Sequence, residues 1–559
     1  MTGYVSSRDD GFPARASARI AAGCDRARQF GRPHAHSHPA RLAAVARIFG
    51  LDAAALGSAR VLEIGCASGG DIIPLAAQHP RGIFIGLESS AAQARRGNER
   101  IERLALMNIR ILTGDVAAFD WQSRRFDYIL CHDAYRYGPA PIRAAILRVI
   151  ASCLAANGVA YVGCNVLPGW RRSQALRDVL MSRLSADCDA AAQVARSRAF
   201  LAALSRWKGP DTLHHRSLRE TAADAMEMPD EYFAHEFLRD DQEPETFTRF
   251  IEQSAKAGLA YLGDCEIWTM LAENFGPRAR VLLQPPADDS PAPMEQSIDN
   301  LTGRARRQSL FVHAARSAKI ARAVDRSRLE GLHFLGDLGR SDEAASPDAW
   351  TFVGAGGRRV STSSAAARRA FEALIARAPA SLSLADLLAA GAPARGALGE
   401  DDRAAVVDAV QRAVVAGAIE ARAAPVLAAS AVSTHPVAPP WCRSDAAAGE
   451  GSLASLRHEA ITLDVVARTL LPLLDGTRDH AALADALIAR AAAGELRFSQ
   501  DGAAANDPRV ARICAPNHVA RALDHLRGRA LLSPSDQPPG LAAANAGPPL
   551  LRAVGAPST

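Results

Sequence analysis

Lysine is scarce in this sequence, and it lacks long apolar runs and paired metal-binding motifs. Lys accounts for three of the 65 basic residues (positions 208, 256 and 319), so Arg carries almost all of the positive charge. No run of about 18 apolar residues occurs, and a membrane span is therefore not expected. The nine cysteines form no CxxC pair and no zinc-like spacing with His, so we expect neither a disulfide framework nor a metal site.

The first ten residues have no apolar core of the kind found in signal peptides, and we expect a cytoplasmic protein. At 559 residues the chain is too long for one hydrophobic core, and its length favours roughly three or four domains. The formal net charge of +5 is small for this size and gives no strong argument for nucleic-acid binding.

Between residues 60 and 164, short apolar runs alternate with helical patterns. We expect strands at 60–64, 82–87, 109–113, 126–131 and 158–164, and helices at 71–78, 91–106 and 142–154. An earlier segment, 38–50, has the pattern of an amphipathic helix that ends at Gly50. Strands and helices that alternate in this way predict an α/β fold with a doubly wound, mostly parallel, Rossmann-like sheet.

The strongest local signal is the segment Arg60-Val-Leu-Glu-Ile-Gly-Cys-Ala-Ser-Gly-Gly-Asp71. An apolar strand leads through Glu63 into a turn that contains Gly65, Gly69 and Gly70. Glycine lets a backbone approach a ligand closely, and the N-terminus of the following helix offers free N–H groups to a carboxylate. The spacing GxxxGG differs from the GxGxxG of dinucleotide-binding folds. Taken alone, the motif could also be a plain strand-to-helix turn.

Two more acidic residues stand at the ends of the next two strands. Glu88 lies 23 residues after Gly65, where a ribose-binding acid is expected, and Asp115 follows the third strand, where it can accept from an adenine amino group. Three acids at successive strand ends after a glycine turn predict a class I methyltransferase that binds S-adenosyl-L-methionine. The expected binding residues are Glu63, Gly65, Cys66, Ala67, Gly69, Glu88, Ser89, Gly114, Asp115 and Val116.

Over about residues 36–532 the sequence resembles the rickettsial-type outer-membrane-protein lysine methyltransferases. The matching segments of the first third are Ser37-His-Pro-Ala-Arg-Leu42, Glu63-Ile-Gly-Cys-Ala-Ser-Gly-Gly70, Phe126-Asp-Tyr-Ile-Leu130, Ala156-Asn-Gly-Val-Ala-Tyr-Val162 and Pro168-Gly-Trp170. More specific, because generic methyltransferases lack them, are Tyr232-Phe-Ala-His-Glu-Phe-Leu238, Gly258-Leu-Ala-Tyr-Leu-Gly263, Leu456-Arg-His-Glu459 and Leu470-Leu-Pro-Leu-Leu-Asp-Gly476. The resemblance implies a methyltransferase regulatory domain, a helical insert that can support a homodimer, and a protein lysine side chain as the acceptor.

The sequence departs from this family at two places. The family usually has Tyr-Asn-Thr-Tyr-Pro-Gly-Trp where this chain has Cys164-Asn-Val-Leu-Pro-Gly-Trp170. It usually has His-Gly-Val-Tyr-Ser-Trp-Val-Pro where this chain has His132-Asp-Ala-Tyr-Arg-Tyr-Gly-Pro139. We expect cofactor binding to survive both changes, which leave the identity of the substrate open.

Candidate catalytic residues follow the fourth and fifth strands, because doubly wound folds bind ligands at the carboxyl ends of their strands. His132 could contact the cofactor or take a proton, or could be a packed or capping residue. Tyr135 and Tyr137 could line an acceptor channel through cation–π contacts, or could belong to the core. Asn165 could orient an amine or stabilise a turn. Asp133 could steer a cationic acceptor or be a solvated loop acid, whereas His235 and Glu236 are interpreted as structural.

The domain boundaries that we expect are a loosely ordered N-terminus at 1–35, a methyltransferase domain at 36–280 with a helical insert at about 172–235, a linker and helical regulatory segment at 281–345, a middle α+β domain at 346–424, a linker at 425–450, a C-terminal winged-helix-like domain at 451–535 and a disordered tail at 536–559. Residues 296–330 are predicted to be helical and the Pro-rich segment 425–440 to be disordered.

Arginines cluster at 304, 306 and 307 and at 368 and 369. They could contact phosphate, but solvated faces are the simpler interpretation, so a nucleic-acid partner is not favoured and a protein acceptor is. Two other functions remain open at this point. One is methyl transfer to a small molecule or nucleic acid, and the other is a non-catalytic, cofactor-binding regulator.

Overall fold

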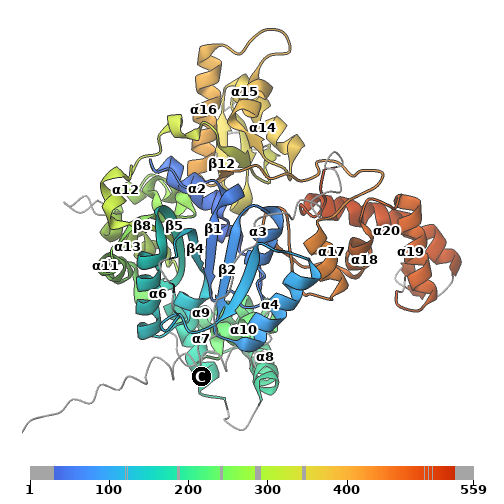
Figure 1. The fold of residues 1–559 in the computed structure, drawn as a ribbon, viewed down its shortest axis with the longest axis horizontal. Coiled ribbons are helices and arrows are strands. Elements are labelled where there is room, and N and C mark those ends of the chain that lie inside the picture. The colour runs from blue at the N-terminus through green and yellow to red at the C-terminus, as the bar shows by residue number, and fades with distance from the viewer. Residues whose placement is uncertain are drawn as a thin grey trace, which may run out of the picture.

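The computed structural model describes residues 31–119, 121, 124–184, 189–239, 243–283, 291–342, 348–496, 498–500, 503–505 and 508–534. Most of the N-terminus that we expected to be loosely ordered, and the tail at 536–559, lie outside these residues. Figure 1 shows a sheet-and-helix core at the centre, with residues 171–237 below it, residues 333–422 above it and residues 440–528 to its right. Among the described helices, none combines the length and apolar character needed to cross a membrane.

The core sheet has the strand order β3-β2-β1-β4-β5-β8-β7, and the short strand β6 also pairs with β5. Its strands are β1 (Arg60–Ile64), β2 (Ile83–Glu88), β3 (Ile109–Thr113), β4 (Phe126–Cys131), β5 (Leu154–Leu167), β6 (Glu245–Thr246), β7 (Leu259–Asp264) and β8 (Arg306–His313). The first five are parallel, whereas β8 is antiparallel to β5 and to β7. The predicted doubly wound, mostly parallel sheet is confirmed.

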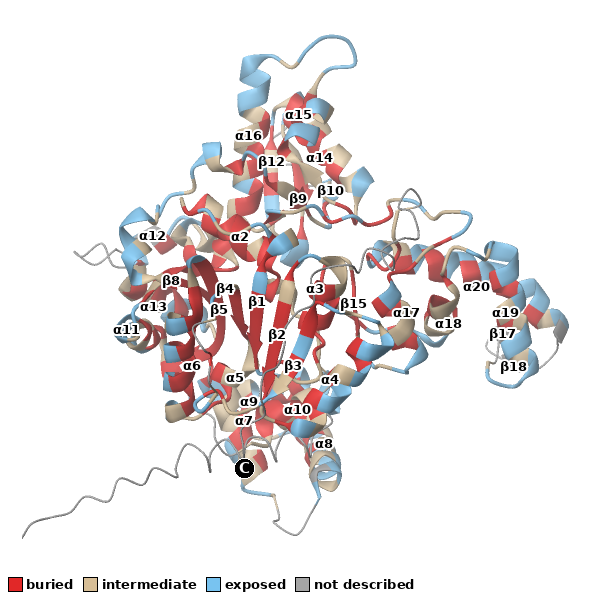
Figure 2. Ribbon diagram, viewed as in Figure 1, coloured by how far each residue is buried: buried red, intermediate tan, exposed pale blue. Residues whose placement is uncertain are grey.

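Helices cover both faces of this sheet, and in Figure 2 its central strands are coloured mostly as buried. The core helices are α2 (Pro39–Ile48), α3 (Ile72–Gln78), α4 (Ala91–Arg103), α5 (Asp133–Arg136), α6 (Ala140–Cys153), α11 (Phe247–Lys256), α12 (Ala279–Leu282) and α13 (Pro291–Thr302). Parallel strands with helices on both faces are apolar on both sides, which explains why the apolar runs of the sequence locate β1 to β5 well.

The helical insert consists of α7 (Arg171–Met181), α8 (Ala190–Arg206), α9 (Leu213–Met226) and α10 (Asp230–Phe237). These helices bury a small apolar cluster of their own, which includes Leu176, Leu201, Ala222 and Phe233. The insert therefore packs as a separate unit against the carboxyl ends of the core strands, where α10 reaches Arg136.

The middle domain joins two small sheets to three helices. Its elements are β9 (His333–Leu335), β10 (Gly339–Ser341), β11 (Trp350–Val353), β12 (Arg359–Thr362), α14 (Ala365–Arg377), β13 (Leu382–Ser383), α15 (Leu384–Gly391), α16 (Glu400–Val415) and β14 (Glu420–Arg422). The apolar cluster of the core sheet continues into this domain through Phe352, Phe371 and Val410. Core and middle domain thus share one hydrophobic interior.

The C-terminal domain has its own apolar cluster, which includes Trp441, Leu470, Leu487 and Leu523. Its elements are α17 (Pro440–Ala447), β15 (Leu453–Ala454), β16 (Ala460–Ile461), α18 (Val465–Leu470), α19 (His480–Ala492), β17 (Phe498–Gln500), β18 (Ala503–Ala505) and α20 (Pro508–Gly528). In Figure 1 it lies beside α3 and α4 of the core.

Two predictions about the later chain are wrong. Residues 306–313 form the strand β8 instead of continuing a helix, because the run from Ser309 to Val312 is buried between β5 and β7. The segment 425–440 is not disordered. It has almost no helix or strand, but Val426, Ala428 and Ala438 are buried, and the Ala429 N–H donates to the carbonyl oxygen of Leu532.

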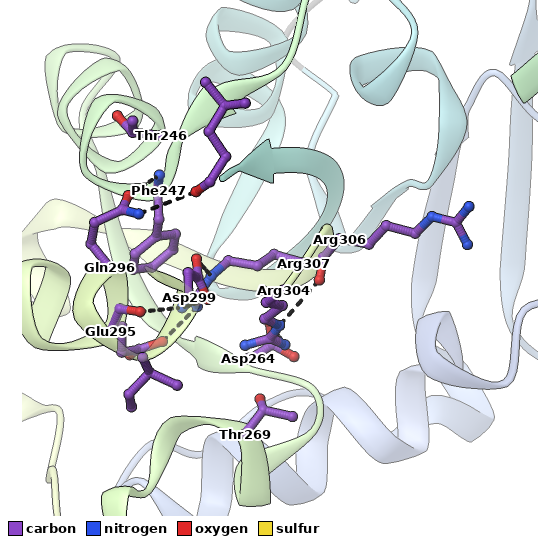
Figure 3. A network of polar contacts seen from close by, with 12 residues as sticks. Thr246, Phe247, Asp264, Thr269, Glu295, Gln296, Asp299, Arg304, Arg306 and Arg307 are labelled. Atoms are coloured by element: carbon purple, nitrogen blue, oxygen red, sulfur yellow. Dashed lines mark hydrogen bonds and ion pairs between the residues drawn. The ribbon is translucent and has the colours of Figure 1, made fainter. Parts of the chain in front are cut away.

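A buried ion cluster fixes the far edge of the sheet (Figure 3). Arg307 on β8 donates two hydrogen bonds to the carboxylate of Asp299 at 2.8 and 2.9 Å and one to Glu295 at 2.6 Å, and its guanidinium lies 3.6 Å from the centre of the Phe247 ring. Arg304 pairs with Asp264 at 3.0 Å. Arg307 is therefore neither a solvated residue nor a free phosphate ligand.

We predict that Arg307→Ala strongly destabilises the core, because two buried carboxylates would lose their counter-charge. Removing one partner of a buried pair typically costs about 3–5 kcal/mol. Urea denaturation followed by tryptophan fluorescence should show this loss. The matched control is Arg249→Ala, which removes a 70% exposed side chain 4.0 Å from Glu245 and should cost less than about 1 kcal/mol. Equal effects of the two variants would contradict the argument.

Candidate active site

The carboxyl ends of β1, β2, β3 and β4 meet along one edge of the core sheet, where two adjoining cavities lie. The larger is about 480 Å³ and the smaller about 80 Å³, and both are lined by Gly65, Asp133 and His235. The strand order reverses between β1 and β4, and a crevice at such a switch point is the usual ligand site of doubly wound folds. If the three predicted acids bind a ligand, they should line these cavities.

The glycine turn forms part of the wall of the larger cavity. Gly65 has φ +75°, and a Cβ atom there would lie 2.7 Å from Cβ of Ala134, so a side chain is excluded both by conformation and by space. Ala67 also has a positive φ of 47°, and Gly65, Cys66 and Ala67 line the cavity. Gly69 stands at the far side of the turn with φ +78°. The turn exposes backbone in place of side chains toward the cavity.

Glu63 points into the larger cavity from the end of β1. Its side chain is buried, and its Oε2 atom has no hydrogen-bond partner among the described residues. Burial, together with the nearby charges of Asp71 and Glu88, raises the pKa of Glu63 well above its usual range. A buried, unpaired carboxyl oxygen at a cavity wall is a group that a ligand amine can satisfy.

Glu88 lines the smaller cavity and also braces the turn. One carboxylate oxygen accepts from the Ala67 N–H at 2.8 Å, and the other accepts from the Ser90 N–H at 2.9 Å and from the Ser89 hydroxyl at 3.3 Å. Burial raises the pKa of Glu88, and these hydrogen bonds oppose that rise. Because an ionised carboxylate has about four acceptor positions, one remains for a ligand hydroxyl.

Asp115 completes the smaller cavity together with Gly114 and Val116. One of its oxygens accepts from the Ala117 N–H at 2.8 Å, so the residue also caps a short turn after β3. The structure thus brings together Glu63, Glu88 and Asp115, with Ser89, around adjoining cavities. Nine of the ten predicted binding residues line one or both cavities, and the exception is Gly69, which belongs to the turn but lines neither cavity.

His132 lies at the wall of the larger cavity directly after β4. Its Nδ1 is 2.7 Å from the Tyr161 hydroxyl, and its ring stacks on that of His34 with centroids 3.6 Å apart and planes at 18°. Burial, with the charges of His34 and Arg136, lowers the pKa of His132 well below 6.5. His132 is thus a neutral imidazole at pH 7 and is poorly suited to holding a proton.

The ligand atoms of His34, His132 and Asp133 lie within 4.8 Å of one another, near enough for three metal ligands. An imidazole nitrogen coordinates a metal in the plane of its ring. Two rings that stack almost parallel have no common in-plane position between them, so this arrangement does not suit an ion.

Tyr135 and Asn165 lie away from the cavities. Tyr135 is fully buried, packs against the Phe250 ring and donates to Glu245 at 3.1 Å. Asn165 accepts from Arg136 at 2.6 Å. Tyr135 and Asn165, both predicted as catalytic candidates, therefore make packing contacts and do not line either cavity.

Other residues around His132 do line the cavities. Asp133 faces both cavities, and its Oδ1 atom is buried without a hydrogen-bond partner among the described residues. Tyr137 lines the smaller cavity and meets the His235 ring edge-on at 4.1 Å. His235, interpreted from sequence as structural, therefore stands at the site, whereas Glu236 is held by Arg136 at 2.7 Å.

Sequence reasoning missed the segment that crosses the glycine turn. Residues 31–38, here called the N-terminal strap, contribute Gly31, Arg32, Pro33 and His34 to the larger cavity. The strap is tied to the carboxylate of Asp71, which accepts from the His34 N–H at 2.8 Å and from the Ser37 hydroxyl at 2.7 Å. The one available signal was the Ser37-His38 segment of the family resemblance, since residues 31–35 have no clear period.

We predict that His132 makes the protein less stable in acid. An unfolded imidazole binds a proton below its ordinary pKa of about 6.5, whereas the buried ring does not, so stability falls as the pH drops below 6.5. Between pH 6.5 and 5.5, wild type should lose about 1 kcal/mol of unfolding free energy more than His132→Gln. Urea denaturation at the two pH values measures this difference. Parallel pH profiles would contradict a neutral buried ring.

Three family models match separate parts of the chain. Residues 61–158 match "Methyltransferase domain", residues 229–313 match "Predicted methyltransferase regulatory domain", and residues 434–531 match "PKMT, C-terminal winged helix domain". Two curated relatives come from Rickettsia prowazekii (strain Madrid E). Uncharacterized protein RP789 is 30% identical over 309 residues, 54% of either chain. Uncharacterized protein RP028 is 28% identical over 222 residues, which are 40% of this chain and 89% of that one. The chain thus spans only about half the length of RP789.

Among solved structures, the chain is similar to PKMT2 from Rickettsia typhi. The structure of PKMT2 in complex with AdoHcy matches with a TM-score of 0.79 and 22% identity, over 90% of this chain and 99% of that one. A second structure of PKMT2 matches with a TM-score of 0.78. These likenesses establish a common fold. The chain therefore carries a Rossmann-like methyltransferase domain, a methyltransferase regulatory domain and the C-terminal winged helix domain of the PKMT proteins, which confirms the resemblance seen in its sequence.

Proposed function

We propose that this chain transfers a methyl group from S-adenosyl-L-methionine to a lysine side chain of a protein. The observation that carries the proposal is the placement of Glu63, Glu88 and Asp115 around two adjoining cavities at the glycine turn. The AdoHcy bound by the similar PKMT2 is the product form of this cofactor, and it supports the same assignment here.

The residues present fit the cofactor group by group. The buried, unpaired Oε2 of Glu63 suits the methionyl amino group, and the backbone of the turn suits the methionyl carboxylate. Glu88 suits the ribose hydroxyls, and Asp115 the adenine amino group. When bound, S-adenosyl-L-methionine supplies an activated methyl group on a sulfonium centre. The chain's own residues have to hold donor and acceptor in line, and such positioning can contribute about 7–11 kcal/mol.

The part of the larger cavity that the methionyl end of the cofactor would leave open suits the acceptor. A lysine has a pKa of about 10.4, and losing its proton at pH 7 costs about 4–5 kcal/mol. Asp133 can attract the ammonium group to the cavity, because its buried Oδ1 accepts no hydrogen bond from a described residue and the Arg136 guanidinium stays 3.8 Å away. The neutral His34 and His132 rings add no positive charge that would repel it, because burial lowers the pKa of both. Desolvation inside the cavity favours the neutral amine, whose proton would pass to solvent, and transfer of the methyl group would leave AdoHcy as the second product.

The first test is binding of AdoHcy measured by calorimetry. Glu88→Ala should weaken binding about ten-fold or more, because it removes the acceptor for a ribose hydroxyl and the brace on the turn. Glu99→Ala is the matched control, an exposed acid on the neighbouring helix α4 that should leave affinity unchanged. An unchanged affinity of the Glu88 variant would remove the ribose assignment.

The second test identifies the acceptor. Incubation with methyl-labelled cofactor and fractionated lysate should label material that protease destroys and nuclease spares, and acid hydrolysis of it should yield methyllysine. Asp133→Asn should raise KM for that protein while leaving AdoHcy affinity near wild type, since it removes a charge that faces the acceptor. Label in nucleic acid or in small molecules would assign another acceptor. A chain that binds AdoHcy but transfers no label would be a non-catalytic regulator.

A further inference from the structure

We infer that the C-terminal domain completes the cofactor site, with His458 and Asp445 as positioning residues that hold the glycine turn. This inference rests on the proposed function, because it takes the turn to be the cofactor-binding element. It concerns two buried contacts that cross from the C-terminal domain to opposite sides of the turn. Neither of these residues touches the cavity itself.

The first contact is made by His458. This residue lies in the loop between β15 and β16, and its Nε2 is 2.6 Å from Oδ1 of Asp71, with both side chains almost fully buried. Asp71 directly follows the glycine turn and precedes the first residue of α3. Because the same carboxylate holds the His34 N–H and the Ser37 hydroxyl, it joins turn, strap and C-terminal domain at one point.

The second contact is made by Asp445 on α17. Its two oxygens accept from Nε and from one terminal nitrogen of Arg100 at 2.8 and 2.5 Å, and the Asp445 side chain is almost fully buried. The other terminal nitrogen of Arg100 lies 3.4 Å from the carbonyl oxygen of Gly69. A residue 345 positions further along the chain thus orients the arginine that caps the turn.

Two further observations point to positioning rather than to simple domain docking. His458 has φ +66°, a conformation that is unfavourable for a residue with a side chain and persists only where its surroundings impose it. The same hairpin also supplies Gly451, Ser452, Ala460 and Thr462 to the wall of the larger cavity. The β15–β16 hairpin, whose His458 binds Asp71, therefore also forms part of the wall of the larger cavity.

The N-terminal strap also packs directly against the glycine turn. A Cβ atom at Gly70 would lie 1.7 Å from the carbonyl oxygen of Gly31, so turn and strap touch through their backbones. Without His458, the buried Asp71 carboxylate would lose its hydrogen-bond partner from the C-terminal domain and would keep only the two donors of the strap. We therefore expect loss of either contact to loosen the turn and to weaken cofactor binding.

The test measures AdoHcy affinity by calorimetry in the full chain, with thermal unfolding recorded in parallel. His458→Gln and Asp445→Asn keep side-chain volume and remove one contact each. Each should weaken binding about ten-fold or more, because a buried charge loses its partner. The matched control is Arg457→Ala. It removes the neighbouring buried side chain, which binds Asp337 at 2.7 Å and the Pro379 carbonyl at 2.9 Å and so joins the C-terminal to the middle domain.

Affinity should stay near wild type in the Arg457 variant even where its melting temperature falls. An equal loss of affinity in this control would mean that any disturbed domain contact suffices, and it would overturn the inference. So would wild-type affinity in both the His458 and Asp445 variants. If wild type itself bound no AdoHcy, the proposed function would fail, and this inference would fail with it.

A double variant and a hydrogen-exchange measurement distinguish a specific effect on the turn from a general loss of folding. If His458 acts through Asp71, then Asp71→Asn together with His458→Gln should bind AdoHcy no more weakly than Asp71→Asn alone. Because coupling between two sites is reciprocal, AdoHcy should slow hydrogen exchange at residues 453–461 of wild type but not in α19. Additive losses in the double variant, or no change in exchange at 453–461, would contradict the inference.

Discussion

The carboxylate of Asp71 is the point on which the candidate site depends. It accepts hydrogen bonds from the strap and faces the imidazole of His458 at 2.6 Å, although these groups are far apart in the sequence. Burial by itself would raise the pKa of this acid. The charge of His458 and the hydrogen bonds outweigh that effect and lower the pKa to about 2, so the carboxylate stays ionised. One ionised group can then fix the glycine turn, the strap and the C-terminal domain together.

Glu63 stands beside this charge and responds in the opposite way. It is buried next to Asp71 and Glu88, and burial together with these charges raises its pKa. Two neighbouring carboxyls thus differ in role because their partners differ: Asp71 is held by His458 and by two donors of the strap, whereas Glu63 has an oxygen left unpaired at the cavity wall. Such divergence of neighbouring acids is typical of functional sites.

The core sheet could be predicted from the sequence because β1, β2 and β4 are buried along almost their whole length and have apolar sequences, whereas the edge strand β3 alternates buried and exposed residues. The three strand-end acids followed from the same pattern, since parallel strands end at one edge. The strand β8 could not be predicted, because Arg306 and Arg307 look like a helix surface until Glu295 and Asp299 of α13 neutralise Arg307. This is a tertiary contact overriding a local preference.

The positions of Tyr135, Asn165 and His458 were beyond sequence reasoning for a related reason. Spacing places Tyr135 after a strand end, but the turn of α5 decides which side chain faces the cavity, and it selects Asp133. The pairing of His458 with Asp71 spans 387 positions, and no local period records it. Two segments of the family resemblance, Ser37-His38 and Leu456 to Glu459, meet at this contact, which gives a physical reason for both to be distinctive.

The two departures from the family affect different parts of the structure: one lies in packed residues and the other lines the cavities. In the first, Cys164 is buried in β5 opposite Arg307, and Asn165 accepts a hydrogen bond from Arg136, which also binds Glu236 of the insert, so this segment has a packing role. The second departure places Asp133 and Tyr137 in the lining of the cavities. A change in packing shifts the insert as a whole, whereas a charge added at the cavity wall changes which acceptor is attracted. If the proposed function holds, differences in acceptor between this chain and its relatives are therefore expected to originate in residues 132–139, where Asp133 lines both cavities and its buried Oδ1 accepts no hydrogen bond from a described residue.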